Sequence, residues 1–189
     1  PDHVGNTFFD DGSVSFTTLL ARRPDDVVRS FDWLSSADSP LADCVVQEDG
    51  YAVSGHSFGG YTSFVISGST LDAVPFDQAC AAGDAEACTI VDTLEQDEAG
   101  RFDLSDSRVW AVAVLTPWDG GLLDTTGQQG VEHPALVIGA ELDATTPMSM
   151  VTKLFDDLSS APKHLAEVSE AGHFSFAPIA CTLFDQDGC

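Results

Sequence analysis

Basic residues are scarce in this sequence. Of its 189 residues, 7 are Lys or Arg and 31 are Asp or Glu, which gives a formal net charge of −24. A charge of this size repels phosphate backbones and anionic lipid headgroups, so it argues against nucleic-acid binding and against attachment to a membrane surface. Asp outnumbers Glu by 23 to 8. Such an excess of short carboxylates fits a salt-adapted or extracellular surface as well as it fits a merely acidic protein.

Long apolar runs, internal repeats and metal-binding motifs are also missing. No run approaches the roughly 18–20 apolar residues of a membrane span. The five cysteines form no CxxC pair and no cluster with His, so no zinc site is predicted. Residues 185–188 (DQDG) begin like a calcium loop, but no Glu closes that loop at the required distance.

The cysteines are spaced as two local pairs and one remainder. Cys80 and Cys88 bracket a short polar stretch, and Cys181 and Cys189 bracket the C-terminal residues. We predict a disulfide within each pair and a leftover thiol at Cys44, which favours an oxidising compartment and a secreted or periplasmic protein. The alternative is a cytosolic enzyme with five free thiols.

Strand-like apolar runs alternate with helix-like segments along the chain. The strand-like runs are 51–54, 109–115, 135–140 and 164–168, and the helix-like segments are 24–35, 61–69 and 146–158. This alternation predicts one α/β domain over residues 1–189, with a mostly parallel sheet flanked by helices. Residues 71–107 form a long, acidic, cap-like excursion. The near-continuous apolar run 109–115 is typical of a strand covered on both faces.

One motif carries chemistry. Residues 55–59 (GHSFG) match G-x-S-x-G and lie between a buried strand and a helix, where this motif forms a nucleophile turn. The flanking glycines are needed because the turn is sharp and projects the Ser57 hydroxyl above the sheet. The backbone N–H of Phe58, at the start of the following helix, would then face the oxyanion of an acyl-transfer reaction.

A serine nucleophile needs a base and a group that orients the base. Asp143 follows the strand 135–140 and His173 follows the last strand, which gives the order Ser, Asp, His. Carboxyl ends of parallel strands meet at one edge of the sheet, so we expect Asp143 and His173 to converge on Ser57. Glu141 is the alternative acid. The remaining histidines (His3, His56, His133 and His164) are expected to be structural, His56 as a packing and hydrogen-bonding residue.

Aromatic side chains near this edge indicate a substrate cleft. Trp118 comes just after the strand 109–115 and is expected to lie on the same rim as the triad, as a substrate-stacking wall or as a rim-packing residue. Phe58 is expected to line the same cleft. Trp33 and Trp110 fall within a helix and a strand, so both are predicted to be core residues.

At these residues the sequence resembles the α/β-hydrolases, in the branch of cutinase-like polyester hydrolases, dienelactone-hydrolase-like proteins and platelet-activating-factor acetylhydrolases. The polyester hydrolases of this branch include polyethylene terephthalate hydrolases. The resemblance spans essentially the whole chain and lies in residues 2–7 (DHVGNT), 55–60 (GHSFGG), 116–119 (TPWD), 139–147 (GAELDATTP) and the Cys181–Cys189 pair. It implies Ser57, Asp143 and His173 as the triad, Phe58 as an oxyanion donor and Trp118 as a cleft residue.

The resemblance also implies that this chain differs from the family at its N-terminal end. In the family, several strands and a loop that donates the second oxyanion N–H precede the segment that residues 2–7 resemble, so the resemblance implies an N-terminally shortened fold. The strand at 51–54 is then expected to be an apolar edge that invites pairing, including self-association.

The sequence therefore predicts a serine ester hydrolase that acts through an acyl-enzyme and needs no cofactor or metal. The expected substrates are short-chain or aromatic esters, with polyesters as a further candidate. The alternative is a weak or inactive hydrolase-fold domain with a binding or structural role. Intracellular dienelactone hydrolysis is disfavoured, because the family members with that activity typically carry a Cys nucleophile at the position where this chain has Ser57.

Overall fold

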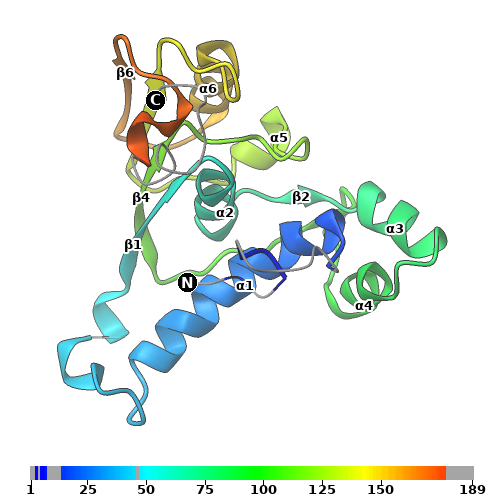
Figure 1. Ribbon diagram of the computed structural model, residues 1–189. Helices are drawn as coiled ribbons and strands as arrows, with labels where there is room; N and C mark the ends of the chain where they lie inside the picture. Colours follow the sequence, from blue (N-terminus) through cyan, green and yellow to red (C-terminus); the bar gives the residue numbers. More distant parts are fainter. Residues whose placement is uncertain (1–2, 4, 8–13, 46, 178–189) are drawn as a thin grey trace.

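A four-stranded parallel sheet forms the centre of the molecule. The computed structural model describes residues 3, 5–7, 14–45 and 47–177. The strands are ordered β1 (Tyr51–His56), β4 (Val109–Leu115), β5 (Ala135–Ala140) and β6 (Lys163–Val168), and each neighbouring pair is parallel (Figure 1). The predicted α/β class is confirmed. Strand β1 is an outer strand of the described sheet, as expected for the run 51–54.

Helices cover one face of this sheet. Helix α2 (Phe58–Ile66) packs on β1 and β4, α6 (Met148–Asp157) packs on β5 and β6, and α1 (Phe16–Leu34) packs against α2 (Figure 1). Residues 60–66 of α2 are all buried, because the helix lies between α1 and the sheet. Short α5 (Thr125–Gln128) packs beside α6, and the 3₁₀ turns are η1 (Ala42–Cys44), η2 (Gln47–Asp49) and η3 (His173–Phe176). No described helix has the length and hydropathy to cross a membrane.

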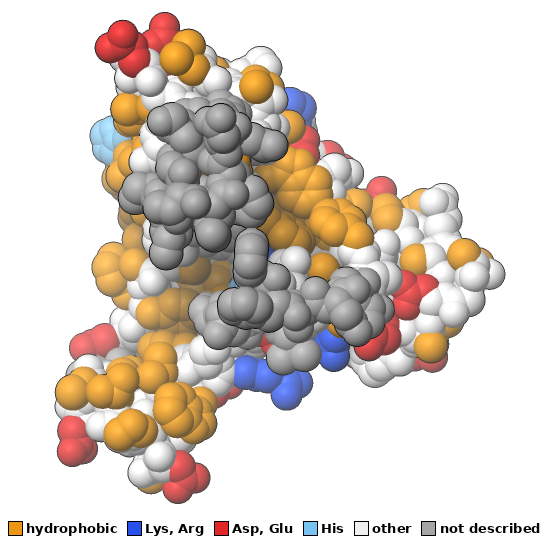
Figure 2. Space-filling view, viewed as in Figure 1, with side chains coloured by type: hydrophobic (Ala, Val, Ile, Leu, Met, Phe, Trp, Pro, Cys, Tyr) orange, Lys and Arg blue, Asp and Glu red, His pale blue; other side chains and the backbone are white. Residues whose placement is uncertain are grey.

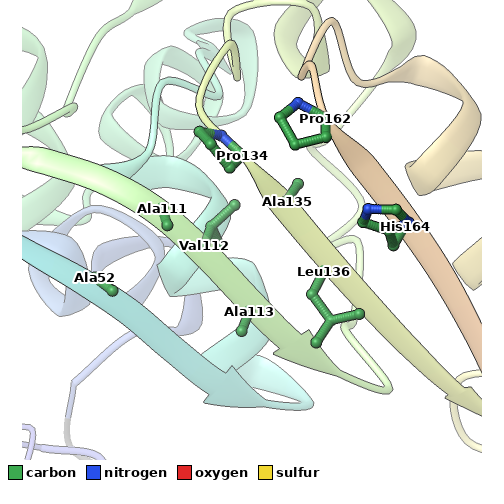
Figure 3. Close-up of a pocket in the computed structure, with 9 residues that line it drawn as sticks. All are labelled: Ala52, Ala111, Val112, Ala113, Pro134, Ala135, Leu136, Pro162 and His164. Carbon is green, nitrogen blue, oxygen red and sulfur yellow. The ribbon is translucent and has the colours of Figure 1, made fainter.

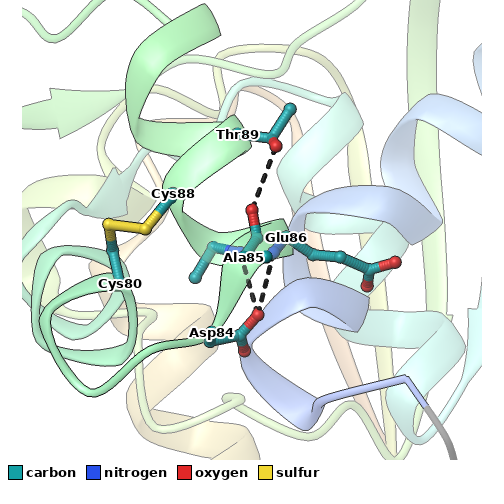
Figure 4. Close-up of a disulfide and its surroundings, with 7 residues drawn as sticks. Cys80, Asp84, Ala85, Glu86, Cys88 and Thr89 are labelled. Atoms are coloured by element: carbon teal, nitrogen blue, oxygen red, sulfur yellow. Dashed lines mark hydrogen bonds between the residues drawn. A yellow bond between two sulfur atoms is a disulfide. The ribbon is translucent and has the colours of Figure 1, made fainter.

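Residues 71–107 fold into a small lobe beside α1. It contains β2 (Leu71–Asp72), α3 (Val74–Ala81), α4 (Ala85–Thr93) and β3 (Arg101–Phe102), with β2 and β3 antiparallel. Asp84 caps α4 by accepting hydrogen bonds from the backbone N–H groups of Glu86 and Ala87 (Figure 4).

The disulfide between Cys80 and Cys88 ties α3 to α4 and confirms the first predicted pair (Figure 4). Cys44 is free, as predicted, and its side chain is exposed. The predicted Cys181–Cys189 pair lies outside the described residues.

Helix α1 begins earlier than the sequence indicated. It starts at Phe16, capped by the Ser15 hydroxyl, so Pro24 lies inside the helix rather than at its first position. A proline lacks the N–H that would bond to the carbonyl four residues earlier. Here the hydroxyl of buried Tyr61 donates to that carbonyl, on Leu20, over 3.2 Å. The tertiary contact therefore replaces the missing bond of the helix.

On the second face of the sheet, the described residues form an apolar hollow. Figure 3 shows this apolar pocket, which is formed by residues of β1, β4, β5 and β6 and by the prolines just before β5 and β6. Its lining residues are Ala52, Ala111, Val112, Ala113, Pro134, Ala135, Leu136, Pro162 and His164. Ala111, Ala113 and Leu115 of β4 are half-buried, so among the described residues the expectation that 109–115 is covered on both faces holds only in part.

Two predicted core residues are instead on the surface. Trp110 is 56% exposed and Trp33 is 54% exposed. Strand β4 buries Val112 and Val114 beneath α2 and leaves Trp110 on the surface, and α1 contacts α2 through its first half, which leaves Trp33 near its end in solvent.

Candidate active site

Ser57 lies in a strained turn between β1 and α2. Its φ of 55° and ψ of −117° fall in a region that side chains rarely adopt. Its N–H donates to the carbonyl of Leu115 over 3.0 Å, and its own carbonyl accepts from the N–H groups of Gly60 and Trp118. A Cβ on Gly55 would lie 2.1 Å from the carbonyl oxygen of Gly59, so only glycine fits there. The predicted strand–turn–helix geometry is present. The need for glycine is shown at Gly55 but not at Gly59, where a Cβ would meet no atom within 4 Å.

The first backbone N–H of α2 is available beside Ser57. Within the described residues, the Phe58 N–H makes no backbone hydrogen bond, as expected for the first turn of a helix. The helix dipole adds partial positive charge at this point. An oxyanion that forms next to Ser57 would find this donor already in place.

Asp143 is buried at the end of β5, and both of its oxygens are used. Oδ1 accepts from the backbone N–H groups of Thr145 (2.8 Å) and Thr146 (2.7 Å). Oδ2 lies 2.8 Å from Nδ1 of His173 and 2.8 Å from the Thr146 hydroxyl. Four donors compensate for the loss of water around this carboxylate. The alternative acid Glu141 is exposed and accepts instead from the N–H of Glu170.

His173 is 2% exposed and begins η3. Nε2 of His56 donates to its backbone carbonyl over 2.9 Å, and the two rings lie 4.6 Å apart. Burial lowers the pKa of His56, and the hydrogen bond to the His173 carbonyl opposes that shift in part. The expected packing and hydrogen-bonding role of His56 is therefore confirmed, and the ring braces the loop that carries His173.

The other histidines lie elsewhere. His3 pairs with Asp26 over 3.0 Å, and His164 lines the apolar pocket on the second face of the sheet (Figure 3). His133 precedes β5, at the opposite end of the strand from Asp143. Among the described histidines, His173 is the one whose ring lies beside Asp143, the acid that follows β5.

Backbone strain collects at this edge of the sheet. The described residues other than glycine with positive φ are Ser57 (55°), Thr116 (41°) and Glu170 (56°). They follow β1, β4 and β6, at the carboxyl ends of the strands. Thr116 is β-branched, which makes a positive φ costly, and its buried hydroxyl has no partner among the described residues. Such strain is typical of functional sites.

An aromatic wall flanks the Ser57 turn. The Phe58 ring lies 5.4 Å from Trp118 in an edge-on contact and 5.6 Å from Phe16 in a stacked one. Phe16 also contacts Trp118 at 5.4 Å and is 51% exposed. The Arg23 guanidinium lies 4.1 Å from the centre of the Phe58 ring and donates to the Thr62 hydroxyl.

Trp118 and Phe58 thus lie together as expected. Phe16 was not predicted, because the sequence places it 41 residues before Ser57 and nothing local connects the two. On the face that Figure 1 also shows, apolar side chains are exposed over much of the described surface, including the end of the molecule where α1 ends, and acidic side chains lie mainly at its outer parts (Figure 2).

The proposed nucleophile Ser57 and the proposed base His173 do not share a hydrogen bond in the described structure. Within the part of the chain that the structure describes, no hydrogen bond links the Ser57 hydroxyl to His173. In free enzymes such bonds are often long and tighten only when substrate binds. No group of three or more His, Cys, Asp or Glu among the described residues could hold a metal ion.

Comparison with known proteins adds no family to this geometry. No protein-family model matches the chain. A search of curated proteins also finds no match. The resemblance to α/β-hydrolases therefore rests on the sequence motifs alone.

Proposed function

We propose that the protein is a serine carboxylic-ester hydrolase of α/β-hydrolase type, with Ser57 as nucleophile, His173 as base and Asp143 as the residue that orients His173. The buried 2.8 Å contact between Asp143 and His173 carries the proposal, since it lies at the strand ends that also hold Ser57 in a strained turn. A carboxylate on Nδ1 leaves Nε2 of the imidazole free to take a proton.

The proposed reaction has two halves. Nε2 of His173 takes the Ser57 proton as Oγ attacks the ester carbonyl carbon, and the carbonyl electrons move onto oxygen beside the Phe58 N–H. His173 then protonates the leaving alkoxide as the C–O bond breaks, which leaves an acyl group on Ser57. Water, deprotonated by His173, attacks that acyl group, and the acid is released as Ser57 regains its proton. No step needs a cofactor.

The aromatic wall supports a substrate class. Phe16, Phe58 and Trp118 present ring surface beside Ser57, and ring–ring contacts favour aromatic groups. A pocket next to the Trp118 loop and the start of α6, lined among others by Leu123 and Met150, could hold a further part of a longer ester. We therefore propose short-chain or aromatic esters as substrates and polyesters as a candidate class.

Three further parts of the proposal rest on separate observations. The Cys80–Cys88 disulfide supports a secreted or periplasmic location. The outer position of β1 supports self-association by edge pairing. The charge of −24 supports a protein that binds neither nucleic acid nor membrane surfaces.

A second candidate function is a weak or inactive hydrolase-fold domain with a binding role. The missing hydrogen bond between the Ser57 hydroxyl and His173 in the described residues favours it. Turnover of p-nitrophenyl acetate separates the two candidates when wild type is compared with Ser57→Ala. We expect turnover that the substitution lowers by more than about a thousandfold. Equal rates for both proteins would support the binding role.

A further inference from the structure

We infer that Thr146 is a positioning residue, whose hydroxyl fixes the Asp143 carboxylate against His173. The inference rests on the proposed function in that it concerns the same site. Thr146 is fully buried between β5 and α6. Its Oγ1 lies 2.8 Å from Oδ2 of Asp143 and 3.2 Å from Nδ1 of His173. The hydroxyl therefore touches both members of the pair at the atoms that join them.

The local sequence around Thr146 is typical of a helix N-cap, but Thr146 does not cap a helix. A Thr followed by Pro before an apolar helix is typical of a helix cap. In the structure the residue at the cap position of α6 is Pro147, and no side chain caps the helix. The hydroxyl of Thr146 points instead toward the Asp143 carboxylate, so helix capping does not explain a threonine here.

The two oxygens of Asp143 are held differently. Oδ1 accepts two backbone N–H groups of its own loop, which any residues at 145 and 146 except proline would supply. Oδ2 accepts from two side chains, His173 and Thr146. Without the hydroxyl, His173 is the one remaining donor to Oδ2 among the described contacts. The carboxylate is then freer to rotate about its Cβ–Cγ bond and to leave the imidazole.

The hydroxyl also connects the acid loop to β4. Thr146 Oγ1 lies 3.1 Å from the carbonyl oxygen of Thr116, the strained residue that precedes the Trp118 loop. One hydroxyl carries one proton, so it donates to Asp143 or to Thr116 but not to both at once. The shorter distance favours Asp143, and a donor to a charged acceptor makes the stronger bond. The Thr116 carbonyl provides a second acceptor when Asp143 turns fully toward a protonated His173.

A positioning role predicts a particular kinetic pattern. The substrate does not touch Thr146 in the proposed mechanism, so its loss changes the chemical step rather than substrate binding. Loss of the Thr146 hydroxyl removes a hydrogen bond to the charged Asp143 carboxylate, and a bond of this kind corresponds to a fall of about tenfold to a hundredfold in kcat. KM is expected to stay unchanged. A general loss of folding would lower kcat through the amount of active protein and would show in thermal unfolding.

The test compares Thr146→Val, which keeps the shape and removes the hydroxyl, with Thr146→Ser, which keeps the hydroxyl. Thr152→Val is the matched control, since it makes the same change on α6 at a residue with no side-chain hydrogen bond among the described contacts. Two quantities are measured: kcat and KM on p-nitrophenyl acetate, and the far-downfield proton resonance of the His173 Nδ1–H. The resonance reports the Asp143–His173 bond whether or not the protein hydrolyses esters.

We expect Thr146→Val to lower kcat at constant KM and to broaden or remove the downfield resonance, Thr146→Ser to restore both, and Thr152→Val to match wild type. A sharp, unshifted resonance in folded Thr146→Val would overturn the inference, as would equal defects in the Val and Ser variants. If wild type shows no turnover while the resonance responds as expected, the positioning role holds and the proposed function fails.

Discussion

Nε2 of His56 donates a hydrogen bond to the backbone carbonyl of His173. The residue before the proposed nucleophile thus holds the backbone of the proposed base. Because the bond needs a proton on Nε2, neutral His56 is fixed in one tautomer. The motif position between Gly55 and Ser57 therefore has a role of its own, which is to set where the His173 loop lies relative to the Ser57 turn.

The buried position of His56 predicts that stability falls in mild acid. Burial lowers the pKa of His56 and of His3 below 6.5 in the folded protein. The unfolded chain then binds more protons than the folded one, so the free energy of unfolding decreases as the pH falls below about 6.5 and recovers above it. Chemical denaturation at pH 7.5 and at pH 5.5 measures this loss.

His56→Gln is the comparison for this prediction, because a glutamine amide can still donate to the His173 carbonyl but does not titrate. We expect the variant to lose less stability than wild type between the two pH values. An identical loss in both proteins would assign the acid sensitivity to other groups.

Asp143→Asn is predicted to lower kcat by about 10⁴-fold, since an amide in this place favours the wrong imidazole tautomer. Glu141→Gln is the control: Glu141 is exposed, and an amide oxygen can still accept from the Glu170 N–H. Steady-state kinetics on p-nitrophenyl acetate decide between the two acids. A large loss in Glu141→Gln with little loss in Asp143→Asn would reverse the assignment.

Phe16 is predicted to bind the aromatic part of a substrate. Phe16→Ala should lower kcat/KM for p-nitrophenyl benzoate by about twofold to tenfold, the usual value of one ring–ring contact, and change p-nitrophenyl acetate less. Trp33→Ala is the matched control, an aromatic residue of similar exposure on the same helix. Equal effects on both esters would show that Phe16 does not contribute to specificity.

Tyr61 is predicted to stabilise α1 through the carbonyl that Pro24 leaves unpaired. Tyr61→Phe should lower the free energy of unfolding by about 1–3 kcal/mol, because the Leu20 carbonyl loses its donor. Pro24→Ala supplies a backbone N–H to that carbonyl, so Tyr61→Phe should cost less in the Pro24→Ala background. Denaturant titration of the four proteins measures the difference, and the same cost in both backgrounds would refute this pairing.

The features that the sequence predicted correctly are those that depend on residues close together in the chain or on the order of the strands. The G-x-S-x-G turn needs only the residues from Gly55 to Gly60, and the positions of Asp143 and His173 follow from parallel strands whose ends meet at one edge. The Cys80–Cys88 pair is likewise local.

What it predicted poorly depends on contacts between distant segments. Pro24 looked like a helix start because the sequence does not reveal that Tyr61 replaces its missing bond. Trp33 and Trp110 were predicted to be core residues because they lie in an apolar helix and an apolar strand. The pattern does not show that the neighbouring elements end before they cover these two side chains. Phe16 reaches the site because α1 packs beside the Ser57 turn. Thr146 reaches it because the Asp143 loop packs against His173. Neither contact is visible in the local sequence.

In the proposed mechanism, Ser57 is an activated nucleophile. Covalent labelling with a fluorophosphonate, located by mass spectrometry in wild type and in His173→Gln, tests it most directly. We expect stoichiometric labelling at Ser57 that falls sharply in the variant. A folded wild-type protein that stays unlabelled, or that is labelled at another serine, would contradict it.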